Sequence, residues 1–296
     1  MNGVVNINKP AGITSHDVVG RLRKIFNIKK IGHTGTLDPD ACGVLPMCIG
    51  RATKAADMLT AKDKQYIAEV SLGKATDTLD SSGTVTETAE VNVSLDEIKS
   101  TASEFVGDIM QIPPMYSAIK VNGKKLCDMA RGGEVIERTP RSVRIDRIDV
   151  LSFDEEKNKF KMLVDCSKGT YIRTLCDDIG RKLGCFAHMS ALTRTKSGKF
   201  CIENSYSLDE VEKMYLDGDL SFLIPLDDIF SDYQKLTIAE RKAKKMCNGT
   251  QVNVQGAEEG RTYRVYDEKG NFLTISTMQQ GVLKIEKTFY QALDGE

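Results

Sequence analysis

The first apolar pattern along the chain has the period of an α-helix. Its members recur every three or four residues and would share one helix face: Val18, Val19, Leu22, Ile25 and Phe26. Ser15 precedes them as the expected N-cap, because its hydroxyl can accept a backbone N–H of the first turn. We therefore predict an amphipathic helix that begins at about residue 15.

Two other segments alternate with the period of a β-strand, residues 64–73 and residues 160–166. The apolar faces would carry Tyr66, Ala68, Val70 and Leu72 in the first strand and Phe160, Met162, Val164 and Cys166 in the second. After the second strand, the pattern indicates a helix over about 171–183 that ends at Gly184.

Three Ser/Thr-x-x-Glu pairs mark further helix starts, because the two side chains can cap each other's backbone N–H groups. The pairs are Ser94 with Glu97, Ser207 with Glu210, and Thr237 with Glu240. The end of the chain is strand-rich, with TYRVY, FLTIST and VLKIE separated by Lys-Gly and Gln-Gly turns.

Strands and helices mix irregularly up to about residue 233, without a βαβ repeat, a G-x-G-x-x-G motif or a P-loop. This pattern predicts an α+β fold with a mostly antiparallel mixed sheet in residues 1–233, followed by a small β-rich module in residues 234–296. The missing motifs argue against a nucleotide cofactor.

Composition narrows the class of protein further. Of the 296 residues, 41% are hydrophobic and 28% charged, which excludes wholesale disorder. The eight cysteines contain no C-x-x-C pair and only three histidines accompany them, so we expect reduced thiols and no structural metal. The N-terminal residues lack the pattern of a signal peptide and no stretch is long and apolar enough to span a membrane, so a cytoplasmic protein is expected.

The net charge of −1 argues at first against a nucleic-acid partner, but the charges are unevenly distributed. No acidic residue lies between Asp17 and Asp38, whereas five basic residues do, and in residues 117–147 eight basic residues accompany four acidic ones. A polyanion responds to the local charge that its phosphates meet, so a basic face remains compatible with RNA. An ordinary solvated surface explains the same charges equally well.

Three segments concentrate reactive residues and glycines: GHTGTLDPDACGVLP at 32–46, DKQY at 63–66, and CSKGTYIRTL at 166–175. Each also has an ordinary structural explanation, because Asp-Pro forms turns, a strand tyrosine packs in the core, and a helix arginine pairs on the surface. On their own, the residues indicate an α+β protein that binds nucleic acid or hydrolyses a substrate.

These three segments resemble the active-site motifs of the TruB family of tRNA pseudouridine synthases, in the same order. VVNINKPAGITSHDVV, QIPPMYSAIKVNGKKL and LGCFAHMSALTRT resemble the family as well, so the similarity covers essentially the whole chain. The resemblance implies a pseudouridine synthase catalytic domain with an RNA-clasping insertion at about 117–147, and a PUA-like RNA-binding module from 234 onward.

The resemblance also implies a role for individual residues. Asp38 would be the nucleophile, Arg173 would hold Asp38 ionised and aimed, and Tyr66 would stack on the uracil and relay a proton. His33, Tyr171 and Leu192 would contact the flipped nucleotide, because the reaction requires the base to leave its stack. The reaction is an isomerisation, so no cofactor and no metal is expected.

The expected partner is the T arm of tRNA, with the uridine at tRNA position 55 as the target and no obligate protein partner. Lys124, Lys125 and Arg131 of the insertion would contact the RNA backbone. We expect a monomer that acts alone. The alternatives are a guide-RNA-dependent synthase, and a tRNA-folding chaperone for which modification is secondary.

Overall fold

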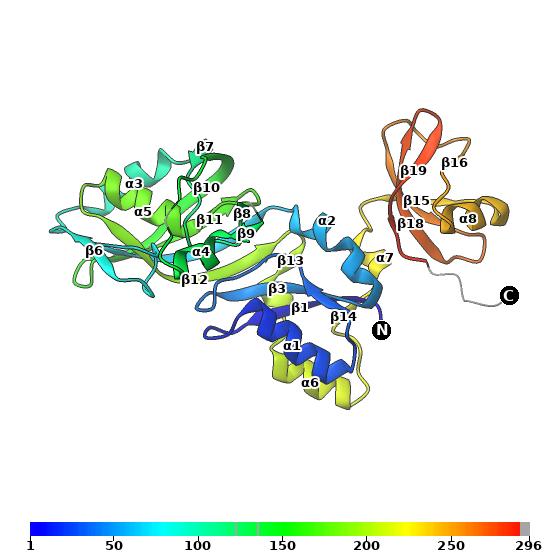
Figure 1. The fold of residues 1–296 in the computed structure, drawn as a ribbon, viewed down its shortest axis with the longest axis horizontal. Helices are drawn as coiled ribbons and strands as arrows, with labels where there is room; N and C mark the ends of the chain where they lie inside the picture. Colours follow the sequence, from blue (N-terminus) through cyan, green and yellow to red (C-terminus); the bar gives the residue numbers. More distant parts are fainter. Residues whose placement is uncertain (122, 135, 291–296) are drawn as a thin grey trace.

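The computed structural model describes residues 1–121, 123–134 and 136–290, apart from the side chain of Lys125 (Figure 1). The strands of a large sheet lie between Gly3 and Ile224, and a smaller five-stranded sheet forms the C-terminal module. Within the described residues, no helix is long and apolar enough to cross a membrane. All eight cysteines are free thiols.

The large sheet is mixed and mostly antiparallel, which confirms the predicted fold class. Along its path the strands follow the order β14 (Leu223–Ile224), β1 (Gly3–Lys9), β3 (Cys42–Ile49), β12 (Ala187–Ser197), β4 (Lys64–Leu72), β11 (Lys159–Cys166), β10 (Arg141–Asp154) and β7 (Gly107–Gln111). Two short strands extend it, β2 (Ile31–His33) on β3 and β13 (Phe200–Cys201) on β12. Only the β3–β12 pair is parallel among these pairings. Two-stranded ribbons lie beside the sheet, β5 (Lys74–Thr76) with β6 (Val85–Thr88) and β8 (Lys120–Val121) with β9 (Lys124–Lys125).

The predicted strand faces are correct, because the alternate residues Tyr66 to Leu72 and Phe160 to Cys166 are buried in one apolar core. Helices cover this core. They are α1 (Ser15–Phe26), α3 (Leu95–Ser103), α5 (Ile172–Lys182) and α6 (Leu208–Leu216). α5 packs on β12, and α1 packs on α6 and β2 (Figure 1). The short helices η1 (Gly50–Ala55), α2 (Ala56–Thr60), η2 (Ile202–Asn204) and α7 (Leu226–Ile229) connect the strands.

Two of the predicted capping boxes are confirmed, since Ser94 caps α3 with Glu97 and Ser207 caps α6 with Glu210. The cap predicted at Ser15 is wrong, because Thr14 caps α1 together with Asp17.

The third predicted capping box, Thr237 with Glu240, is also wrong. Thr237 is the last residue of β15 (Gln234–Thr237), where it is paired with Tyr266 of the neighbouring strand. Helix α8 (Glu240–Cys247) therefore begins after Ala239, whose methyl group cannot accept a capping hydrogen bond.

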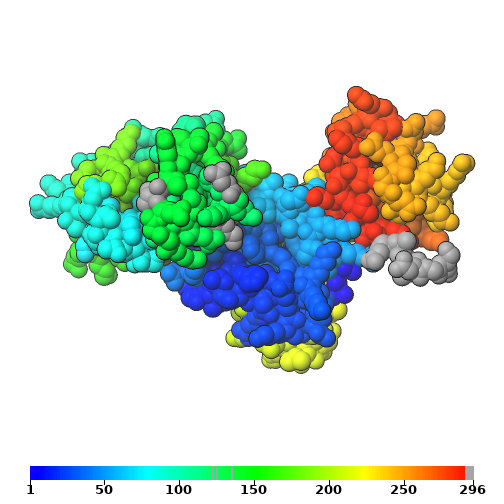
Figure 2. Space-filling view, viewed as in Figure 1, coloured from blue at the N-terminus to red at the C-terminus, as the bar shows by residue number. Residues whose placement is uncertain are grey.

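The C-terminal module follows the predicted strand pattern. Its sheet has the order β15, β17 (Thr262–Tyr266), β18 (Phe272–Gln279), β19 (Val282–Thr288) and β16 (Val252–Asn253). Figure 2 shows the module, in orange and red, beside the light-blue segment that holds η1 and α2. Phe230, Ile275 and Phe289 belong to one apolar cluster shared with β1 and β3. An ion pair between Arg264 and Asp227 of α7 adds a polar contact at 2.5 Å.

The basic insertion leaves the large sheet after β7 and carries β8, β9 and α4 (Leu126–Arg131). It ends earlier than the sequence indicated, because β10 begins at Arg141 and pairs with β7 from its first residue. Residues 141–147 are therefore part of the large sheet, and the segment outside the sheet spans 112–140.

Two helical glycines provide a test of the close packing between α5 and β12. A Cβ on Gly180 would lie 2.3 Å from the Cβ of Ala187, whereas a Cβ on Gly20 of α1 would have nothing within 4 Å. We expect Gly180→Ala to lower the free energy of unfolding by about 1–3 kcal/mol, because the helix must move away from the strand. The matched Gly20→Ala should raise it by roughly 0.5–1 kcal/mol through helix propensity. Urea unfolding measures both, and equal effects of the two variants would contradict the packing described.

Candidate active site

The loop between β2 and β3 presents Asp38, and buried side chains hold its backbone. Lys9, fully buried, donates from Nζ to the carbonyl of Pro39 at 2.9 Å. Ser15, the residue expected to cap α1, instead accepts the N–H of Leu37 at 2.9 Å and donates to its carbonyl at 3.2 Å. The loop is thus fixed on both sides of Asp38.

An arginine at the start of α5 holds the carboxylate of Asp38. Nε of Arg173 lies 3.1 Å from Oδ2 of Asp38, and Nη2 lies 3.4 Å from Oδ1. The side chain of Arg173 is 6% exposed and that of Asp38 is 39% exposed. The structure therefore brings together the two residues that the sequence predicted as nucleophile and partner, with the carboxylate reachable from solvent and the guanidinium beneath it.

A second carboxylate, which sequence analysis missed, shares the same guanidinium. Nη1 of Arg173 donates to Oδ2 of Asp80 and to the carbonyl of Thr78, both at 3.2 Å. Oδ1 of Asp80 is occupied by Thr78 Oγ1 at 2.7 Å and by the backbone N–H of Ser82 at 3.0 Å. Leu79 between them has a left-handed backbone, φ 62°, a conformation that costs a non-glycine residue about 1–2 kcal/mol. Sequence composition around Asp80 indicates only a turn, because its partner lies 93 residues away.

The base of the basic insertion also reaches the guanidinium. Nη2 of Arg173 donates to the carbonyl of Tyr116 at 2.8 Å. Just before it along the chain, the amide of Gln111 bonds both backbone groups of Tyr171, at 2.8 Å to its N–H and 3.0 Å to its carbonyl. The insertion is therefore anchored on the same turn of α5 that carries Arg173.

Burial sets the protonation behaviour of Asp38. It raises the pKa of the carboxyl above its usual value, and the charge of Asp80 adds to this effect. The Arg173 guanidinium opposes the rise but does not cancel it. The carboxylate is consequently more basic than an exposed aspartate, and it is ionised only above a pH higher than usual for that residue.

Two tyrosines lie near Asp38. Tyr66 is buried on β4, and burial raises the pKa of its phenol. Tyr171, the N-cap of α5, is half-buried, and burial raises the pKa of its phenol. Both phenols are neutral at pH 7. Leu192 is buried on β12, with Cys42 Sγ against its carbonyl at 3.6 Å.

His33 ends β2 and is half-buried beside the loop of Asp38. The N–H of Gly35 donates to its Nδ1 at 3.3 Å, so the proton of the neutral ring belongs on Nε2. Burial lowers the pKa of the imidazole, and the nearby charge of Arg194 lowers it further. His33 is therefore a neutral ring with a free donor.

The predicted backbone-contacting residues lie on the insertion. Lys124 is exposed on β9, and Arg131 is exposed at the end of α4, where it lies 3.8 Å from Asp128. The side chain of Lys125 falls outside the described residues. Across the part of the chain that the structure describes, no three His, Cys, Asp or Glu side chains gather as a metal site would require.

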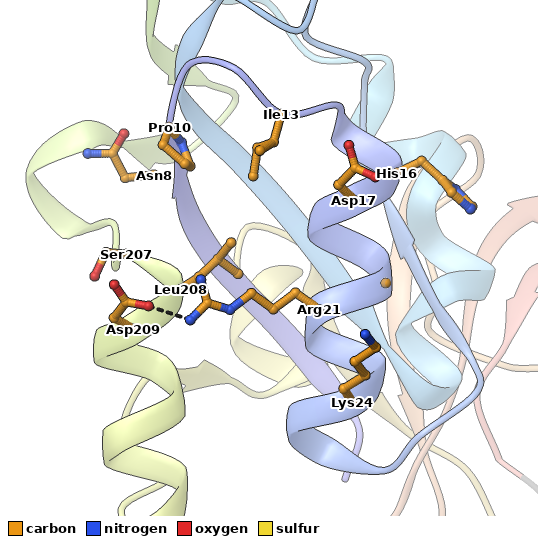
Figure 3. Close-up of a pocket in the computed structure, with 11 residues that line it drawn as sticks. Asn8, Pro10, Ile13, His16, Asp17, Arg21, Lys24, Ser207, Leu208 and Asp209 are labelled. Carbon is orange, nitrogen blue, oxygen red and sulfur yellow. Dashed lines mark hydrogen bonds and ion pairs between the residues drawn. The ribbon is translucent and has the colours of Figure 1, made fainter.

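A hollow lies between α1 and α6 (Figure 3). It measures about 630 Å³, and its wall includes Pro10, Ile13, His16 and Leu208. Arg21 crosses it to form ion pairs with Asp209 and Glu212. None of the predicted site residues lines it, so this hollow is distinct from the site around Asp38.

Comparisons with known proteins identify the family of the chain. A family model described as TruB family pseudouridylate synthase (N terminal domain) matches residues 23–172. A model described as tRNA pseudouridylate synthase B C-terminal domain matches residues 173–231, and one described as Pseudouridine synthase II TruB, C-terminal, matches residues 235–286. The chain belongs to the TruB family. It is therefore a pseudouridine synthase, an isomerase, as its motifs indicated.

Relatives of the TruB family match over nearly the full length. The chain is 46% identical over 291 residues to tRNA pseudouridine synthase B of Clostridium novyi, covering 97% of this chain and 99% of that protein. It is 48% identical over 282 residues to the protein of the same name from Bacillus cereus, covering 93% and 92%.

Two solved structures have similar folds. A chain from an H/ACA RNP bound to a substrate RNA containing 2′-deoxyuridine has a TM-score of 0.73 at 26% identity, with 98% of this chain and 85% of that chain covered. A chain from a Cbf5-Nop10-Gar1 complex has a TM-score of 0.73 at 28% identity, with 97% and 85% covered. Both similarities support the fold of the whole chain, C-terminal module included.

Because Asp38 and Asp80 share the Arg173 guanidinium, we expect Asp80→Asn to change both the pH dependence and the rate of the synthase. The variant removes a negative charge that raises the pKa of Asp38, so the acid limb of the pH–rate profile should move to lower pH. The rate should also fall about 10- to 100-fold, because Arg173 loses a charged acceptor and aims Asp38 less firmly. Single-turnover rates between pH 4 and pH 8 measure both effects.

Asp77→Asn is the matched control. Asp77 lies in the same turn and accepts the N–H of Thr84 at 2.8 Å, without a contact to Arg173. A pH profile that moves equally in both variants would show that the turn as a whole, and not the shared guanidinium, controls Asp38.

Proposed function

We propose that this chain converts the uridine at position 55 in the T loop of tRNA to pseudouridine, alone and without a cofactor. The observation that carries the proposal is the pair of Asp38 and Arg173, with Tyr66 and Tyr171 beside it, in a chain of the TruB family. The names of the relatives from Clostridium novyi and Bacillus cereus, tRNA pseudouridine synthase B, support tRNA as the substrate.

In the proposed reaction, the carboxylate of Asp38 attacks the flipped uridine, at either the sugar C1′ or the base C6. The N1–C1′ bond breaks, the uracil turns, and a bond from C5 to C1′ replaces it. Arg173 orients the nucleophile through two of its nitrogens. The raised pKa of Asp38 suits this role, because a more basic carboxylate is a stronger nucleophile once ionised.

The remaining predicted residues would hold the flipped base. Tyr66 stacks on the uracil and takes the C5 proton in the last step, Tyr171 lines the pocket, and Leu192 supplies an apolar wall. His33, with its Nε2 donor free, would occupy the space near the displaced nucleotides and hold the flipped state.

RNA binding would involve two further parts of the chain. The insertion would close over the T loop, with Lys124, Lys125 and Arg131 near phosphates, and the C-terminal module (234–296) would bind the acceptor side as a PUA-like domain. We propose that residues 1–233 form the catalytic domain, and that the protein acts as a monomer in the cytoplasm without an obligate protein partner.

Two alternatives concern how the site is used. The first alternative is a guide-RNA-dependent synthase, which the similarity to chains from ribonucleoprotein complexes supports. The sequence relatives at 43–48% identity, in contrast, are named tRNA pseudouridine synthase B. A tRNA-folding chaperone with secondary modification activity would use the same RNA-binding surfaces.

The first test of the proposed function uses Asp38→Asn. The amide cannot act as a nucleophile, so the variant should form no pseudouridine while it still binds tRNA. Purified protein is incubated with unmodified tRNA transcript, without guide RNA or cofactor, and pseudouridine is mapped by carbodiimide labelling. If the wild-type protein leaves the T loop unlabelled under these conditions, the stand-alone activity is refuted. Refolding of the transcript by Asp38→Asn would measure the chaperone contribution.

A second test concerns the insertion. Replacement of Lys124 and Arg131 by Gln should weaken tRNA binding and reduce the dependence of log K on log salt by about one to two units, because fewer counterions are released. The control replaces Lys157 and Lys182, exposed cations that are paired with Asp154 and Glu104. A salt slope that changes only in the control would place the phosphate contacts elsewhere.

A further inference from the structure

A second arginine lies inside the sheet behind the active-site loop, and the mechanism above does not use it. Arg194 of β12 is 1% exposed, which makes it one of the largest fully buried side chains. Its Nε donates to the carbonyl of Val44 at 2.7 Å, and its Nη2 donates to the carbonyl of Gly35 at 3.1 Å. The guanidinium thus holds the chain on both sides of the Asp38 loop.

Arg194 also lies beside Tyr66. The two residues are direct partners across the antiparallel β4–β12 pair, so their side chains lie on the same face of the sheet, and the charge of Arg194 acts on the phenol. On its other side Arg194 is the partner of Gly43 in β3, where a Cβ would lie 2.2 Å from the Arg194 carbonyl oxygen. Strands on both sides therefore restrict Arg194 to one position.

No carboxylate compensates this buried charge among the described residues, because none lies within 4 Å of the Arg194 nitrogens. The acceptors of its guanidinium are two neutral backbone carbonyls. An unpaired cation in a dry site favours any negative charge that forms beside it. The phenol of Tyr66 is the neighbouring group that can acquire such a charge by losing a proton.

We propose that Arg194 is a positioning residue of the isomerisation, which fixes the Tyr66 phenol against the Asp38 loop and stabilises negative charge on the phenol oxygen. The inference rests on the proposed function, in which Tyr66 takes the C5 proton. In that step the phenol of Tyr66 first releases its proton to water, and the phenolate that forms beside Arg194 takes the proton from C5. The electron pair of the C5–H bond becomes the C5=C6 double bond, and C6 gives up the bond that it held until then, either its double bond to N1 or its ester bond to Asp38. N1 takes a proton from water, so the phenol ends neutral and no atom is gained or lost overall.

The other groups that face Tyr66 act in the opposite direction. Burial, Cys166 of β11 and the charge of Asp38 all raise the pKa of the phenol, and Arg194 is the group that lowers it. The positive charge of Arg194 also lowers the pKa values of His33, Lys9 and Lys64. Removal of this cation should therefore make Tyr66 a weaker acid.

The first experiment measures this acidity without any reaction. Tyr66 is replaced by 3,5-difluorotyrosine, and its ionisation is followed by ¹⁹F NMR in otherwise wild-type protein and in Arg194→Gln. We expect the phenol pKa to rise by about one unit or more in the variant. Arg194→Lys keeps a cation but not the planar fork, so a smaller rise is expected. An unchanged pKa in the folded Gln and Lys variants would overturn the proposal, and Arg194→Lys suffices if Arg194→Gln does not fold.

The second experiment asks whether the acidity matters for the reaction. Arg194→Gln should lower the single-turnover rate about tenfold for each unit by which the pKa rises, with tRNA affinity unchanged. Difluorotyrosine at position 66, a more acidic phenol, should restore most of this rate. The same replacement at Tyr263, which is buried in the C-terminal module, should restore none.

A purely structural role for Arg194 predicts no rescue from position 66, and that result would refute the proposal. Failure of the proposed function has a different signature, because wild-type protein would then form no pseudouridine in the T loop. The NMR titration would still report whether Arg194 controls the phenol.

Discussion

The candidate active site depends on the contacts of one group, the guanidinium of Arg173. It is almost fully buried and binds four groups from three other segments: the carboxylates of Asp38 and Asp80 and the carbonyls of Thr78 and Tyr116. A buried cation is stable only when its donors are satisfied, so each of these segments must reach its place before the site is complete. The loop, the turn and the base of the insertion are therefore fixed relative to one another by a single side chain.

The strand order of the large sheet brings the parts of this arrangement together. Arg173 begins α5, and α5 packs against β12 so closely that Gly180 has no room for a side chain. β12 lies between β3, which follows the Asp38 loop, and β4, which carries Tyr66. The central strands thus bring residues that are far apart in the sequence to one place, and the helix sets the guanidinium above them.

The parts of the fold that sequence predicts are those with local causes. The capping boxes at Ser94 and Ser207, the alternating faces of β4 and β11, and the C-terminal strands all depend on residues a few positions apart. The predictions that were wrong depend on contacts between residues that are distant in the sequence. The Ser15 hydroxyl binds Leu37 and leaves the capping to Thr14, and Thr237 is held in a strand pair.

The candidate site divides in the same way. Asp38, Tyr66 and Arg173 lie in recognisable motifs, so their resemblance to a family located them. Asp80 and Arg194 could not be found in this way, because their significance arises from partners 93 and more than 120 residues away. A carboxylate in a turn and an arginine in a strand are ordinary residues until the sheet places them.

The two arginines then create different electrostatic conditions in neighbouring parts of the candidate site. Arg173 pairs with two carboxylates, so its charge is compensated by groups that are already negative. Asp38 remains more basic than usual, because burial raises its pKa by more than the pairing lowers it. Arg194 donates to carbonyls and is the cross-strand partner of Tyr66, so its charge remains available to a group that is still neutral. In the proposed reaction, a basic carboxylate favours the first step, attack on the substrate, and a cation beside a phenol favours the last step, removal of a proton. Separate buried arginines would supply these two conditions without neutralising each other.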